Sequence, residues 1–179
     1  MPQDLPNKRA CLRRPACAGR QGFGILEIVI ASAIIGGTLF ALVSIFLLSR
    51  DTIIFSTQKL QASYLAEEGL EVLRFTRDSG WSRNMALLSP GADYYLIFLP
   101  ATSEWIVSFS AQPPIEGLFE RSFKVENVSR DGSSNIETTY NAANNDPGTR
   151  KVTVKVDWSY KNKNQSITAE TYLTDLFAN

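Results

Sequence analysis

An uncharged apolar run from Ile28 to Leu48 constrains the fold of this chain more than any other feature of its sequence. The run is about 21 residues long, and an α-helix rises about 1.5 Å per residue, so as a helix it would span roughly the 30 Å of hydrocarbon in a bilayer. The carboxylate of Glu27 stands at the head of the run. We therefore expect a membrane-spanning helix with an acidic residue at its beginning.

Glu27 needs an explanation, because an unpaired carboxylate in lipid costs several kcal/mol. One interpretation places Glu27 at the water interface as a boundary residue. The other gives it a positively charged partner once the protein is assembled. Glu27 alone does not separate the two.

The residues before Glu27 favour the second interpretation. The segment 21–27 reads Gln-Gly-Phe-Gly-Ile-Leu-Glu and resembles the processing site of type IV prepilins and type II secretion pseudopilins. In that family a basic leader is cut after Gly, the new N-terminal residue is usually Phe and is N-methylated, and a Glu follows four residues later. Gly22, Phe23 and Glu27 match these positions. The resemblance implies that a prepilin peptidase/N-methyltransferase cleaves between Gly22 and Phe23 and methylates Phe23.

The resemblance also implies a role for Glu27. Cleavage creates an α-amine on Phe23 that is largely cationic at neutral pH. In the family this amine pairs with the Glu of a neighbouring subunit, here Glu27, and the low dielectric of the apolar bundle strengthens the attraction between the two charges. The implied partners are other pilin subunits in a helical homo- or hetero-polymer, an inner-membrane assembly platform, and membrane lipid before assembly.

Two features depart from the family pattern. Family leaders often carry Lys or Arg directly before the Gly, whereas here Gln21 intervenes after Arg20. Many pilins have a proline in the second half of the apolar run, whereas this chain has Gly36 and Gly37 in the middle. Paired glycines mark a bend or permit close helix contact, and we favour close contact.

Residues 1–22 are interpreted as a leader that is removed. They contain five basic residues against Asp4, which predicts a cytoplasmic N-terminus by the positive-inside rule; the five are Lys8, Arg9, Arg13, Arg14 and Arg20. Both cysteines, Cys11 and Cys17, lie in this leader, so we expect no disulfide in the processed chain.

Residues 23–48 are predicted to form the membrane and assembly half of one long helix, and residues 49–80 its amphipathic half. Small and apolar residues recur there at helical spacing and predict a face that packs closely on a sheet: Ala62, Leu65, Ala66, Gly69, Val72, Leu73 and Thr76. Glu71 and Arg74 are spaced as an i, i+3 ion pair. Ser79 and Gly80 form a helix stop.

Residues 81–179 are predicted to form an antiparallel β-domain. Apolar and polar residues alternate in five stretches, most clearly from Val152 to Trp158, and turn signals that include 145–148 separate them. The expected fold is therefore α+β and pilin-like: a long N-terminal helix packed on a C-terminal antiparallel sheet of four to six strands.

The composition argues against an enzyme. The chain has no histidine and no phosphate-binding glycine-rich loop, so no catalytic residue and no cofactor is predicted. The loop 131–135 is Asx-rich but lacks the carboxylate spacing of a calcium loop, which favours plain turns and no metal site.

DNA binding is disfavoured, because the chain after the leader is mildly acidic and phosphate neutralisation needs clustered cations. Four lysines interleave with Trp158 and Tyr160, but Trp158 is in phase with the valines and is expected in the core; the lysines are Lys151, Lys155, Lys161 and Lys163.

The sequence thus predicts a structural subunit of a type IV pilus-like filament, of the minor-pilin kind. The alternatives are a pseudopilin of a type II secretion system and a membrane-anchored binding module that never polymerises. The expected location is the inner membrane as a single-pass protein, and then an extracellular pilus or a periplasmic pseudopilus.

Overall fold

The computed structural model describes residue 22 and residues 24–176, and the predicted leader lies outside them apart from Gly22. The backbone separates into two units, and the division lies between Leu48 and Ser49. The elements are α1 (Ile25–Asp78), β1 (Asp93–Leu99), β2 (Glu104–Ser108), β3 (Glu120–Ser129), the short 3-10 helix η1 (Ala142–Asn144), β4 (Asn145–Tyr160) and β5 (Lys163–Thr174). The predicted α+β class is confirmed.

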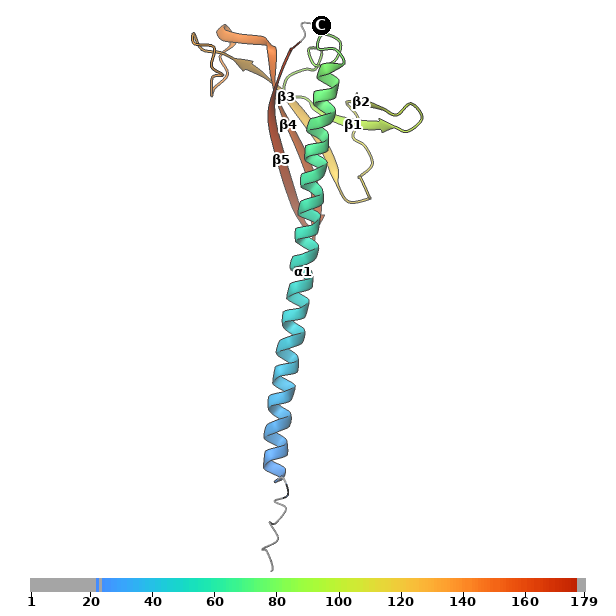
Figure 1. The fold of residues 1–179 in the computed structure, drawn as a ribbon, viewed down its shortest axis with the longest axis vertical. Helices are drawn as coiled ribbons and strands as arrows, with labels where there is room; N and C mark the ends of the chain where they lie inside the picture. The colour runs from blue at the N-terminus through green and yellow to red at the C-terminus, as the bar shows by residue number, and fades with distance from the viewer. Residues whose placement is uncertain (1–21, 23, 177–179) are drawn as a thin grey trace, which may run out of the picture. The chain divides into compact units, whose positions relative to one another are not determined.

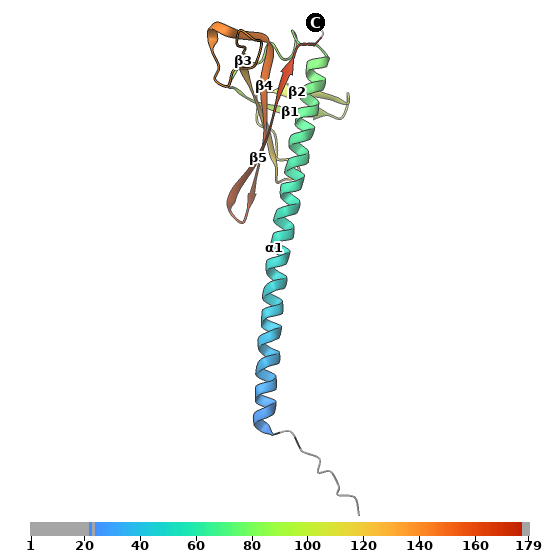
Figure 2. The same ribbon diagram turned by 60° about the vertical axis from the view of Figure 1, so that its left-hand side comes forward.

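The five strands form one antiparallel sheet in the order β2-β1-β3-β4-β5 (Figure 1). β4 and β5 form a long hairpin whose register runs from Thr149↔Thr174 to Tyr160↔Lys163. β3 stops pairing with β4 at Asp157, so the hairpin continues past the end of β3 (Figure 2). The antiparallel sheet predicted from the alternating stretches is confirmed.

The turn predicted at 145–148 is wrong, because these residues begin β4. Asn145 and Asp146 pair with Ser129 and Val128, and the register then shifts so that Arg150 pairs with Asn127. The intervening residues, which include Pro147, form an irregularity of the kind that accommodates a proline in a strand. Cross-strand pairing with β3 has overridden the local turn signal.

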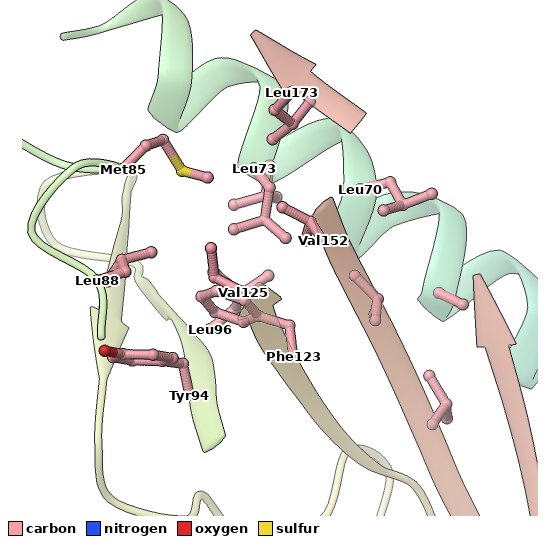
Figure 3. Packing of buried hydrophobic residues seen from close by; sticks show 14 of the residues in the cluster. Leu70, Leu73, Met85, Leu88, Tyr94, Leu96, Phe123, Val125, Val152 and Leu173 are labelled. Carbon is pink, nitrogen blue, oxygen red and sulfur yellow. The ribbon is translucent and has the colours of Figure 1, made fainter. Parts of the chain in front are cut away.

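The second half of α1 packs on one face of the sheet, as its small-residue stripe predicted. Its buried residues are Ala62, Ala66, Gly69, Leu70, Val72 and Leu73. They meet apolar side chains from β1, β3, β4 and β5, several of which Figure 3 shows together; the group includes Leu96, Phe123, Val125, Val152 and Leu173. Trp158 is also buried, which confirms its predicted place in the core.

The helix ends where the sequence predicted. The amide of Ser79 donates to the carbonyl of Phe75, and Gly80 follows with φ +145°, a conformation that side chains rarely adopt. The segment after it folds back over one end of the core and buries Trp81, Met85 and Leu88. No period-two or helical pattern predicted this covering segment.

Candidate membrane and assembly segment

The predicted processing site precedes α1 in the sequence. Gly22 is exposed, whereas Phe23, the predicted cleavage and methylation residue, lies outside the described residues. The carbonyl of Gly24 accepts hydrogen bonds from the amides of Glu27 (3.0 Å) and Ile28 (3.2 Å), which closes the first turn. Glu27 lies in this turn, where the positive end of the helix dipole favours a carboxylate.

The carboxylate of Glu27 is exposed, and it has no hydrogen-bond or ion-pair partner among the residues that the structure describes. It therefore remains available to a cation supplied by another group. Glu27 thus lies in the first turn of α1, directly before the apolar run, as an exposed side chain.

The apolar segment, defined as Ile28–Leu48, has no cover in the described part of its own chain. Its large apolar side chains are between 51% (Ile30) and 77% (Phe40) exposed, on every side of the helix. Exposure of this much apolar surface to water is energetically unfavourable. By length and composition this part of α1 is a candidate membrane span near the N-terminus.

The few hydroxyls of the apolar segment are bonded within the helix. Each donates to a carbonyl about one turn earlier: Ser32 to Val29 at 2.9 Å, Thr38 to Ile35 at 2.9 Å and Ser44 to Phe40 at 3.0 Å. In hydrocarbon an unsatisfied hydroxyl is costly, and these bonds remove that cost. The segment is thus compatible with a surrounding of lipid or of apolar helices.

Gly36 and Gly37 differ from Gly69 in their surroundings. A Cβ built on either residue of the pair has no described neighbour within 4 Å, whereas one built on Gly69 would lie 2.9 Å from Cγ1 of Val154. The two glycines therefore satisfy no packing requirement that the described chain imposes. The helix backbone has no side-chain cover at these two positions, which allows another helix to come close there.

Directly after the apolar segment, the tip of the β4–β5 hairpin is attached to α1. The Tyr160 hydroxyl donates to the carbonyl of Asp51 at 3.0 Å, and the Lys161 ammonium donates to the Asp51 carboxylate at 2.5 Å. The rings of Tyr160 and Phe55 lie 5.3 Å apart. We call these four residues the hairpin clamp. The hydrogen bond that Lys161 donates to the Asp51 carboxylate raises the pKa of Lys161 above its ordinary value, although burial acts to lower it.

The hairpin clamp was not predicted from the sequence. Its two halves are 109 residues apart in the chain, and neither Asp51 nor Tyr160 belongs to a recognisable motif. The one available signal was Tyr160 at the end of an alternating strand, with Lys161 and Asn162 in the turn position.

The lysines that precede Trp158 in β4 are largely engaged with carboxylates. Lys151 pairs with Glu126 and Glu170 at 3.6 and 3.1 Å, and Lys155 pairs with Asp157 at 2.9 Å. These pairs reduce the positive potential that phosphate binding needs.

The Asx-rich loop 131–135 is folded around a single carboxylate. One carboxylate oxygen of Asp131 accepts the amides of Ser133 (2.9 Å) and Asn135 (2.8 Å), and these bonds, from Asn135 first, lower the pKa of Asp131. The loop is therefore an Asx turn. Among the described residues no group of three or more acidic, His or Cys side chains is arranged to hold a metal ion.

Comparisons with protein-family models, with curated proteins and with solved structures find no match for this chain.

Proposed function

We propose that this chain is a structural subunit of a type IV pilus-like filament, made as a prepilin and assembled through α1. The observation that carries the proposal is the order Gly22, Phe23, Glu27 at the head of an apolar helix that its own chain leaves uncovered. A prepilin peptidase would remove residues 1–22 and methylate the new N-terminus. A simple membrane anchor with an acidic boundary residue would not explain the Gly-Phe pair.

The exposed apolar segment supports assembly through helix packing. Before assembly, lipid covers the segment, and in a filament the same segments of neighbouring subunits would cover one another. Lipid is as apolar as a leucine side chain, so this exchange gains little from the hydrophobic effect and depends on close van der Waals packing. The absence of side chains at Gly36 and Gly37 suits that requirement.

Glu27 would fix the register of the subunits. Its carboxylate lacks a partner in the described chain, and the α-amine of Phe23 in the adjacent subunit is a cation of the right kind. A buried pair contributes little net stability, but a subunit in the wrong register leaves both charges unpaired. The pair therefore selects one arrangement against others. A pseudopilus of a type II secretion system would use the same processing and packing.

The N-terminal peptide tests the proposal. We would isolate the chain from native membranes and from sheared surface filaments and measure this peptide by mass spectrometry. A peptide that begins at Phe23 with one added methyl group is expected in both fractions. A chain that still begins at Met1 in cells with active prepilin peptidase would overturn the proposal.

Charge variants test the role of Glu27. Glu27→Leu is expected to reduce incorporation into filaments while the protein still accumulates in the membrane. Glu67→Leu, at an exposed position of the same helix, serves as the matched control and is expected to assemble normally. Undiminished incorporation of Glu27→Leu would exclude the pairing with Phe23, and absence of the unmutated chain from filaments would favour a non-polymerising anchor.

A further inference from the structure

Charge is unevenly distributed over the chain after the apolar segment. Residues 49–179 contain 13 basic and 16 acidic residues. Three of the basic ones lie where the chain leaves the apolar segment and where the hairpin clamp holds the β4–β5 tip, namely Arg50, Lys161 and Lys163, and the one acidic residue among them is Asp51. The other positions carry ten basic and fifteen acidic residues. We call Arg50, Lys161 and Lys163 the basic collar.

The hairpin clamp sets where the collar lies. Arg50 follows the last apolar residue, Leu48, by two positions, and Asp51 follows it by three, which is less than one helical turn. The bonds from Tyr160 and Lys161 to Asp51 hold the hairpin tip beside this turn. Lys163, the first residue of β5, is therefore held near the same turn, although it is far from it in sequence.

The collar keeps an excess of positive charge. Lys161 neutralises Asp51, and Arg50 and Lys163 are exposed side chains with no ion-pair partner among the described residues. Tyr160, an aromatic residue with a polar hydroxyl, borders the collar. Tyrosine is enriched at both membrane–water interfaces, where its ring and hydroxyl lie at the headgroup level.

We propose that the basic collar binds anionic phospholipid headgroups of the membrane that holds the apolar segment. This rests on the membrane-resident stage of the proposed function. An anionic surface attracts the collar and repels the acidic remainder of the β-domain, so it favours one orientation of that domain over others. Attraction of a basic residue to such a surface corresponds to about a fivefold change in the equilibrium for each residue.

The test uses the full chain with Cys11→Ser and Cys17→Ser, reconstituted into vesicles. A fluorophore is attached at Asn164→Cys beside the collar or, as a reference, at Ser133→Cys in the loop after β3. The vesicles contain phosphatidylcholine alone or with phosphatidylglycerol, together with a lipid that carries a quencher on its headgroup. Stronger quenching at position 164 with phosphatidylglycerol is expected, and added salt should weaken it. Position 133 should not respond.

Charge removal provides the matched comparison. The double variant Arg50→Gln with Lys163→Gln should lower the equilibrium constant for binding of the hairpin tip to phosphatidylglycerol vesicles by more than tenfold. Arg83→Gln with Lys124→Gln removes the same charge elsewhere and should leave the response intact. Equal quenching in both vesicle types, or equal responses of the two double variants, would overturn the proposal.

Flotation of the same vesicles separates this proposal from the proposed function. Protein that floats with both vesicle types but shows no lipid-dependent quenching retains its membrane segment and lacks headgroup binding by the collar. Protein that floats with neither vesicle type contradicts the membrane stage itself, and both proposals then fail. Quenching that follows protein density instead of lipid charge would assign the collar to a neighbouring subunit and overturn lipid binding.

Discussion

Gly69 of α1 lies so close to Val154 of β4 that a Cβ on the glycine would come within 2.9 Å of the valine Cγ1. The same Cβ would lie 3.3 Å from Cδ of Arg121 on β3. A side chain at this position therefore requires Val154 to shift and Arg121 to give way slightly. The absence of a side chain at residue 69 sets how near the helix approaches the sheet.

Gly69→Ala is expected to destabilise the β-domain. Overpacking in a tight core costs about 1–3 kcal/mol, which exceeds the gain of about 1 kcal/mol in helix propensity. Urea unfolding of the detergent-solubilised chain, followed by tryptophan fluorescence, measures the difference. Adding Val154→Ala should recover part of the loss, because it removes the methyl that the new Cβ meets.

Gly36→Ala is the matched control for that experiment, since a Cβ there has no described neighbour within 4 Å. It should leave the unfolding of the β-domain unchanged. Equal destabilisation by the two substitutions would mean that contact with Val154 does not set the helix–sheet distance.

Arg121 depends on Glu68 for its charge partner. Its side chain is 4% exposed, and its Nη1 donates to the Glu68 carboxylate at 2.6 Å and to the Leu65 carbonyl at 3.1 Å. Glu68→Ala leaves the guanidinium with one of these bonds, and it should cost about 1–3 kcal/mol of unfolding free energy. Glu67→Ala, at the exposed neighbouring position, should cost much less in the same urea titration.

Acid stability should depend on Asp146. Burial acts to raise its pKa, but hydrogen bonds from Arg130, Thr149 and Gly148 outweigh burial and lower the pKa below its ordinary value of 3.8. The folded state therefore prefers the ionised form. The stabilisation of the folded state by ionised Asp146 is complete above about pH 4, and it is lost as the pH falls through the lowered pKa.

Asp146→Asn should reduce stability at neutral pH and flatten its fall below pH 4. Thermal unfolding at a series of pH values measures both effects. Asp93→Asn, which removes an exposed carboxylate 3.5 Å from Lys124, is the control and should retain the steep acid limb. An unchanged limb in Asp146→Asn would contradict the assignment.

The hairpin clamp should hold the turn of α1 that carries Asp51. Tyr160→Phe removes the hydroxyl bond but keeps the ring beside Phe55, and it is expected to cost about 0.5–1.5 kcal/mol. Tyr160→Ala removes both contacts and should cost more. Hydrogen exchange of the amides of residues 50–56 measures the local loss of stability. Tyr172→Phe, at an exposed position of β5, should leave these exchange rates unchanged.

Much of this fold was predictable because its patterns are local. Val152 to Trp158 alternate with polar residues, and the structure places them as the buried side of β4. The stripe from Ala62 to Leu73 is spaced for a helix face, and it is the face that packs on the sheet. Glu71 and Arg74 form the predicted ion pair. In each case neighbouring residues determine both the element and the side that is buried.

What was missed depends on residues that are distant in sequence. Asn145 and Asp146 carry a turn signal, but pairing with Ser129 and Val128 holds them in a strand. The hairpin clamp joins Asp51 to Tyr160, and no local sequence pattern predicts that contact. At the candidate site, the position of Glu27 was predictable, while its cation would come from another chain and so lies outside any single-chain pattern.

The order of synthesis gives the long α1 an unusual place in folding. Translation completes α1 before any strand has been synthesised, although the buried stripe of α1 packs on β3 and β4. Asp51 can bind Tyr160 only after a further 109 residues have been added. The nascent helix therefore carries an uncovered apolar face until β3 and β4 have been synthesised. Helix formation takes microseconds or less, whereas ribosomes add about 5–20 residues per second, so this exposure lasts for seconds.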